Sequence, residues 1–144
     1  MTTPLWMRIA EAELAASVRE VPGPDSNPRI VEYHSATSFK ATDDRVPWCS
    51  SFVNWCLREA GIPGTRSAAA RSWLTWGDPL ETPEYGCIAV LARGTNPAQG
   101  HVGFYTDTKP DGHILVLGGN QADAVSIAAY APARVLAYRW PHAA

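Results

Sequence analysis

The segment PWCSSFVNWCLREAG, residues 47–61, decides the fold of this chain because it is the strongest helix signal in the sequence. Proline is favoured in the first turn of a helix, and the glycine at residue 61 fits the left-handed position just after its end. Apolar residues recur inside the segment at intervals of three and four, the pattern of a helix with one buried face. These residues are Cys49, Phe52, Val53, Cys56 and Ala60. The segment therefore predicts an amphipathic helix that carries Cys49 in its first turn.

Helical patterns lie on the N-terminal side of Pro83, and strand patterns lie on its C-terminal side. Residues 4–16 have helical spacing, a short helix is expected after Ser26 or Asn27, and another near residues 67–75. Beyond Pro83, short apolar runs alternate with turn residues. The runs cover residues 87–93, 101–108, 113–118, 124–130 and 134–140. Helices followed by strands with short connections predict an α+β fold with an antiparallel sheet of about five strands.

Length and composition exclude several classes of protein. The chain has 144 residues, of which 46% are apolar, so we expect a single domain over residues 1–144. No apolar run approaches the ~18 residues of a membrane span, and a formal net charge of −2 lacks the basic excess of a nucleic-acid binder. The N-terminal stretch mixes Arg8, Glu11 and Glu13 among apolar residues, which is typical of an amphipathic helix and not of a secretory leader. We therefore expect synthesis in the cytoplasm without a signal peptide, no membrane insertion and no nucleic-acid partner.

Cys49 is the most informative single position. The unpaired N–H groups and the positive dipole end of a helix start favour thiolate over thiol, and the thiolate is the nucleophile. From position alone, two interpretations stay open: a nucleophile with a lowered pKa, or a small buried side chain. Cys56 and Cys87 are expected to pack in the core. Three cysteines without a C-x-x-C pair predict neither a disulfide framework nor a thiolate metal site.

A nucleophilic cysteine needs a base, and His101 is the best placed of the four histidines because it opens an apolar strand beside a flexible turn. The base in turn needs a polar partner that fixes its tautomer. Asn120, after the next strand, could face His101 across an antiparallel pair. It could also be a turn residue, because Asn after Gly-Gly suits left-handed geometry. Gln121 and Asp123 are the fallback candidates for the orienting role.

Other chemistries have weaker support. The sequence contains no G-x-S-x-G elbow, H-E-x-x-H helix or phosphate-binding glycine motif. A zinc peptidase could recruit His101, Asp107 and His113, but their spacing is not that of a known ligand set. We therefore expect no metal and no cofactor. Trp48 and Trp73 could line a substrate groove near the site, although core packing is the usual role of such residues.

Four segments together resemble the NlpC/P60 and CHAP group of papain-like peptidoglycan hydrolases, and in particular a subfamily of small bacterial and phage-associated proteins. In chain order they are PWCSSFVNWCLREAGI, GCIAVLARG, GHVGFYTD and LGGNQADAVSI. The resemblance implies a papain-like fold with the N-terminal helices packed on the C-terminal sheet. It also implies a Cys-His-Asn triad, which by position becomes Cys49, His101 and Asn120.

The sequence departs from this pattern at two places. Many relatives carry an aspartate where this chain has Cys87, and many CHAP domains have a glutamine shortly before the nucleophile that binds the oxyanion. The corresponding stretch here, TDDRVPW, has no glutamine. Backbone N–H groups at the helix start, including those of Cys49 and Ser50, could take the oxyanion role.

The resemblance implies a cysteine hydrolase that cleaves an amide bond in peptidoglycan stem peptides, as an endopeptidase or an amidase. Two alternatives remain: a non-catalytic module that binds the cell wall or belongs to a phage particle, and an acyltransferase that uses the same thioester. The expected partner is peptidoglycan or a muropeptide, acted on by a monomer. We expect action on the wall after lysis-type release, as an endolysin, or after specialised secretion, as an antibacterial effector with an immunity protein.

Overall fold

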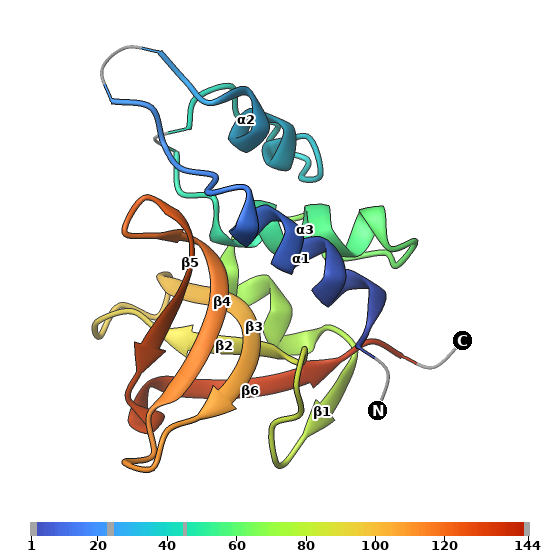
Figure 1. Cartoon of the computed structure of the whole chain (residues 1–144). Coiled ribbons are helices and arrows are strands. Elements are labelled where there is room, and N and C mark those ends of the chain that lie inside the picture. Colours follow the sequence, from blue (N-terminus) through green and yellow to red (C-terminus); the bar gives the residue numbers. More distant parts are fainter. Residues whose placement is uncertain (1–2, 23–24, 45, 143–144) are drawn as a thin grey trace.

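A computed structural model describes residues 3–22, 25–44 and 46–142 of the chain (Figure 1). Three helices come first, α1 (Leu5–Ala15), α2 (Pro28–His34) and α3 (Cys49–Glu59), followed by the 3-10 helix η1 (Ala70–Thr75). The strands follow as β1 (Asp78–Leu80), β2 (Ile88–Ala92), β3 (Gly100–Thr108), β4 (Ile114–Gln121), β5 (Ala124–Tyr130) and β6 (Val135–Trp140), and the 3-10 helix η2 (Pro132–Arg134) precedes β6. No helix in the described part of the chain is long and apolar enough to span a membrane.

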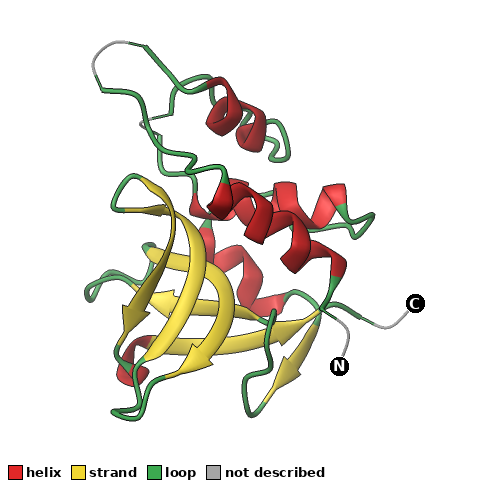
Figure 2. Cartoon of the chain, viewed as in Figure 1, coloured by secondary structure: helices red, strands yellow, loops and turns green. Residues whose placement is uncertain are grey.

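The strands form one antiparallel sheet in the order β1-β6-β2-β3-β4-β5. Figure 2 shows the sheet strongly curled, with α1, α2 and α3 on one side of it. The predicted α+β class with N-terminal helices on a C-terminal antiparallel sheet is confirmed. The sheet has one strand more than expected, because the three-residue β1 pairs with β6. That strand is too short to give a periodic signal.

The main core lies between α3 and the sheet. Phe52, Val53 and Cys56 are completely buried there, which agrees with the predicted apolar face of α3. The second face of the sheet curls around a smaller cluster that includes Cys87 and Leu91. Cys56 and Cys87 therefore pack in the core as expected.

Trp48 and Trp73 do not line a groove, which corrects the expectation that they bind substrate. Both are completely buried. The Trp48 indole N–H donates to Glu20 Oε2 over 3.0 Å, and that of Trp73 donates to Ser50 Oγ over 2.9 Å. A tryptophan with its ring in the core and its N–H satisfied contributes to stability and does not present a surface to a sugar or peptide.

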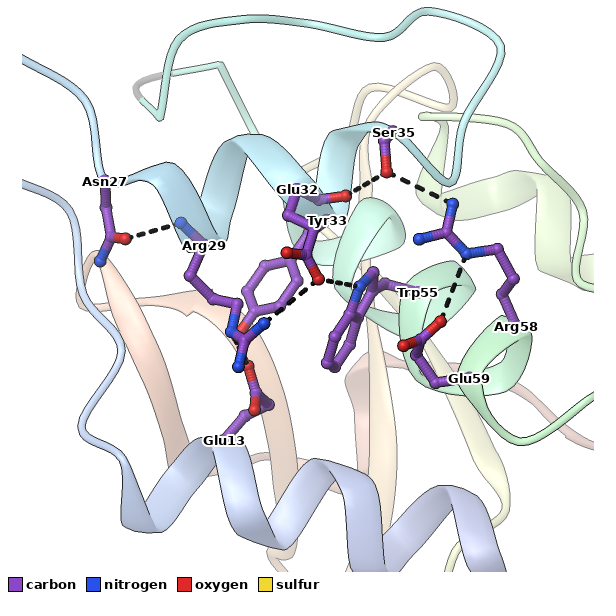
Figure 3. A network of polar contacts seen from close by, with 9 residues as sticks. All are labelled: Glu13, Asn27, Arg29, Glu32, Tyr33, Ser35, Trp55, Arg58 and Glu59. Carbon is purple, nitrogen blue, oxygen red and sulfur yellow. Dashed lines mark hydrogen bonds and ion pairs between the residues drawn. The ribbon is translucent and has the colours of Figure 1, made fainter.

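A polar network holds the short helix α2 against α1 and α3 (Figure 3). Glu13 on α1 is buried; it accepts a hydrogen bond from the Tyr33 hydroxyl over 2.6 Å and pairs with Arg29 over 2.9 Å. Glu32 accepts from the Trp55 indole N–H of α3 over 2.9 Å. Because a seven-residue helix is marginal by itself, these contacts between helices keep α2 in place.

Candidate active site

Cys49 is the first residue of α3, and its sulfur faces strand β3. The backbone N–H groups of Val102, Ser50 and Cys49 itself hydrogen-bond to this sulfur. β3 and β4 pair only from Phe104 onward, so their ladder does not extend to Val102. The side chain of Cys49 is 7% exposed. The start of α3 and the start of β3 thus hold one sulfur between them.

Burial raises the pKa of the Cys49 thiol, whereas the sequence predicts a lowered value. The three backbone N–H groups and the positive charge of Arg93 act in the opposite direction. Desolvation penalises the charged form of a thiol, and here it outweighs the donors of the helix start. The resting thiol therefore keeps its proton until a base removes it.

His101 is the second residue of β3, directly before Val102, and it lines the same cleft as Cys49. Its ring is 9% exposed, and its Nε2 lies 2.9 Å from Oε1 of Gln121. The Gln121 amide nitrogen donates to the carbonyls of Val116 and Ser126, which turns Oε1 toward the imidazole. A carbonyl oxygen only accepts, so His101 carries its proton on Nε2 and keeps the Nδ1 lone pair free.

The residue that pairs with His101 is Gln121, one position beyond the expected Asn120. The register of β4 against β5 shifts between Gly118 and Gln121, which adds one residue to β4. Such a bulge reverses the side on which the following residues lie. Gln121 therefore shares the face of Gly118, where a Cβ would lie 2.9 Å from Gln121 Oε1 and 3.5 Å from His101 Nε2.

Asn120 adopts the left-handed conformation at the bulge, with φ 57°. This agrees with the alternative interpretation of Asn120 as a turn residue. It lines the same cleft as Cys49 and His101. The structure thus brings the three predicted residues to one cleft but gives the hydrogen bond to the fallback orienter Gln121.

Tyr130 and Arg134 complete the surroundings of His101, and the sequence did not indicate either. The Tyr130 hydroxyl donates to Gln121 Oε1 over 3.0 Å, and its ring centroid lies 5.4 Å from that of His101. The Arg134 guanidinium lies 4.9 Å from the Tyr130 ring centroid. These contacts arise because the sheet curls, which a strand pattern along the sequence does not reveal.

The pKa of His101 is lowered, so the imidazole is neutral and able to accept a proton near neutral pH. Burial is the largest cause, and the positive charges of Arg134 and Arg93 act in the same direction. The hydrogen bond to Gln121 opposes them because it favours the charged form.

Cys49, His101, Asn120 and Tyr130 line an open cleft of about 590 Å³. Its lining carries two groups of charges, Glu20 and Asp123 in one and Arg93 and Arg134 in the other. Glu20 and Asp123 lie together, because the Glu20 N–H donates to the Asp123 carbonyl over 2.8 Å. Burial and the neighbouring Asp123 raise the pKa of Glu20.

The zinc alternative does not fit the arrangement of the side chains. Among the residues that the structure describes, no group of three or more His, Cys, Asp and Glu side chains could hold a metal ion. His113 instead has its Nδ1 3.1 Å from Asp111 Oδ1, and an Asp107 oxygen accepts from the Thr108 N–H.

A comparison with protein families gives one match: the model of the CHAP domain covers residues 41–120, more than half of the chain. The matched region contains Cys49 and His101 and ends at Asn120. No curated protein and no solved structure matches the chain.

Proposed function

The chain belongs to the CHAP domain family, and from this premise we propose that it is a cysteine hydrolase of amide bonds in peptidoglycan stem peptides. CHAP domains are generally hydrolases that act on peptidoglycan. One observation supports the cysteine mechanism in particular. The Cys49 sulfur accepts a hydrogen bond from the N–H of Val102, the residue that follows His101. A thiol beside an imidazole of fixed tautomer is the arrangement that nucleophilic catalysis requires.

In the proposed acylation step, the Cys49 proton moves to the free Nδ1 of His101 as the sulfur attacks the scissile carbonyl. The carbon–sulfur bond forms while the carbonyl π electrons move to oxygen. The backbone N–H groups of Cys49 and Ser50 lie at the sulfur, and we assign them as donors to this developing oxyanion. The imidazolium then protonates the leaving amine, the carbon–nitrogen bond breaks, and a thioester remains.

In the proposed deacylation step, His101 takes a proton from water, and the resulting hydroxide attacks the thioester. The carbon–sulfur bond breaks, the sulfur takes the proton back, and a carboxylic acid leaves. Throughout the cycle, Gln121 accepts the Nε2–H and keeps the ring in one orientation. Gln121 is neutral, so it orients the imidazole without adding a charge to it.

The proposal is tested by incubating purified muropeptides with the protein and identifying the products by mass spectrometry. We expect one amide bond to be cleaved with the gain of one water, and no cleavage by Cys49→Ala. Binding without any product would support the non-catalytic wall-binding or phage-particle module. A product that carries an added amine or lipid in place of water would support the acyltransferase.

The proposed substrate is part of the bacterial cell wall, so the enzyme has to reach it from its site of synthesis. Lysis-type release and specialised secretion are the two routes that we propose. The second route would include an immunity protein as a partner.

A further inference from the structure

The cleft holds two arginines from neighbouring strand ends whose charge is not matched by an acid. Arg93 directly follows β2, and Arg134 directly precedes β6, which pairs with β2. The Arg134 Nε–H donates to the Ala92 carbonyl over 3.0 Å, which ties the two strand ends together. Both guanidinium groups are therefore brought to one side of the cleft by the fold itself.

Neither guanidinium is in an ion pair with a carboxylate anywhere in residues 3–22, 25–44 and 46–142. Within the described residues, the Arg134 guanidinium hydrogen-bonds only through its Nε–H and lies on the Tyr130 ring, while Arg93 is exposed. Each guanidinium has five N–H donors in a planar fork, so most of these donors are free to bind a ligand.

The arginines lie close enough to act on the reacting groups. Their positive charges reach His101, and that of Arg93 also reaches the Cys49 sulfur. The acidic residues of the cleft do not neutralise them, because Glu20 accepts from the Trp48 indole and lies beside Asp123. The cleft is therefore positively charged next to the nucleophile and negatively charged elsewhere.

We propose that Arg93 and Arg134 form a subsite for a free carboxylate of the substrate, close to the amide bond that Cys49 attacks. This inference rests on the proposed hydrolase function and narrows its substrate to a peptide with an acidic group near the scissile bond. Paired arginines suit this ligand, because a carboxylate accepts two parallel N–H donors from a guanidinium.

The first test compares alkylation of Cys49 by iodoacetate, which carries a carboxylate, and by neutral iodoacetamide. A change in the thiolate fraction affects both reagents equally, so the ratio of the two rates reports the anion subsite alone. At low salt we expect Arg93→Gln to lower this ratio roughly 3- to 10-fold, and Arg93→Gln with Arg134→Gln to lower it further. Intact mass and peptide mapping give the rates at Cys49.

The matched control is Arg58→Gln, which removes the same charge at the other end of α3, nine residues and about 14 Å from Cys49. It should leave the ratio unchanged. Arg134→Lys keeps the charge and should keep most of the ratio, which separates loss of charge from loss of packing. Thermal unfolding identifies any variant that fails to fold.

The second test measures kcat/KM for two stem peptides that differ only in a free acid or a primary amide near the scissile bond. We expect the wild type to prefer the acid and the double variant to lose this preference by about 10-fold or more. Equal alkylation ratios in the wild type and the double variant overturn the subsite, whether or not peptides are cleaved. If neither peptide is cleaved while the alkylation ratios of the wild type and the double variant still differ, the hydrolase proposal is overturned and the anion subsite is not. Labelling of Cys49 by neither reagent overturns both.

Discussion

At His101 the two ring nitrogens have different surroundings, and this difference sets the chemistry of the site. Nε2 faces Gln121 Oε1 at 2.9 Å, and the same oxygen accepts from the Tyr130 hydroxyl at 3.0 Å. The amide end of Gln121 is held by two backbone carbonyls, so the oxygen cannot exchange places with the nitrogen without losing both bonds. The free Nδ1 is thus a consequence of one well-anchored side chain.

Replacing Gln121 by Ala should lower kcat/KM by about 10- to 100-fold, because His101 loses the acceptor that fixes its tautomer. Gln121→Glu should instead raise the pKa of His101, since a nearby anion favours the imidazolium. The base would then be protonated at a higher pH, and activity near pH 6 should fall relative to pH 8. Muropeptide cleavage over a pH series, with an NMR titration of the imidazole, measures both effects. A larger loss in Asn120→Ala than in Gln121→Ala would show that Asn120 has the orienting role.

The pH dependence of labelling at Cys49 should depend on His101. Burial raises the pKa of this thiol more than the backbone N–H groups and Arg93 lower it, and an imidazolium at His101 would further offset that cost once the proton has moved. In His101→Ala we therefore expect iodoacetamide to label Cys49 at markedly higher pH than in the wild type. Cys56 and Cys87 serve as internal controls, because burial raises their pKa as well and no base is proposed for them. Equal labelling of both proteins at neutral pH would contradict the pairing.

At the scale of elements, the contact between the start of α3 and the bulge of β4 sets the geometry of the site. The start of α3 was predictable, because a proline, a buried stripe and a terminal glycine are local signals. The strand that begins at His101 was predictable for the same reason. The bulge was not predictable, because the sequence LGGNQ contains no local signal that one residue is inserted there. This is why the sequence favoured Asn120 over Gln121.

Gly119 allows this contact, and its replacement by Ala should disturb the site. A Cβ at Gly119 would lie 2.6 Å from the Trp48 ring and 2.8 Å from the Phe52 Cβ, so the start of α3 would have to move. We expect a loss of about 1–3 kcal/mol in the free energy of unfolding and a clear loss of activity. The matched control is Gly61→Ala at the other end of α3, where φ is 78° and no atom lies within 4 Å. It should cost about 1 kcal/mol through backbone strain while activity is retained. Equal activity in the two variants would contradict this role of Gly119.

At the scale of the whole molecule, the curl of the sheet brings the end of β5 and the start of β6 to the cleft that Cys49 and His101 line. Tyr130 and Arg134 reach His101 and the cleft only because of this closure. Their positions depend on the coiling of the entire sheet, which no local pattern specifies. On the other side of the molecule, α2 is held by buried polar contacts to α1 and α3. Two histidines are buried in these different places, His101 at the sheet and His34 where α2 meets α3.

Both buried histidines should make the fold less stable in mild acid. His34 is 1% exposed, and its Nδ1 lies 2.8 Å from Ser51 Oγ. Burial lowers the pKa of His34 and of His101 below the ordinary histidine value of 6.5, although backbone hydrogen bonds at Asp43 and Val46 and the nearby carboxylates oppose the shift at His34. The unfolded chain then binds more protons than the folded one, so the free energy of unfolding rises with pH in this range. The stability that these two neutral histidines contribute is fully present above about pH 6.5, their pKa in the unfolded chain. It is lost as the pH falls from there through their lower pKa values in the folded protein.

Urea denaturation at pH 7.5 and at several values down to pH 5 measures this loss. His34→Gln keeps a polar group that can bond to Ser51 but has no proton to gain, so the dependence on pH should become shallower. Combining it with His101→Gln should make the curve shallower again, because each buried ring contributes separately. If the wild type and the double variant lost stability equally between pH 7 and pH 5.5, other groups would have to carry the acid sensitivity.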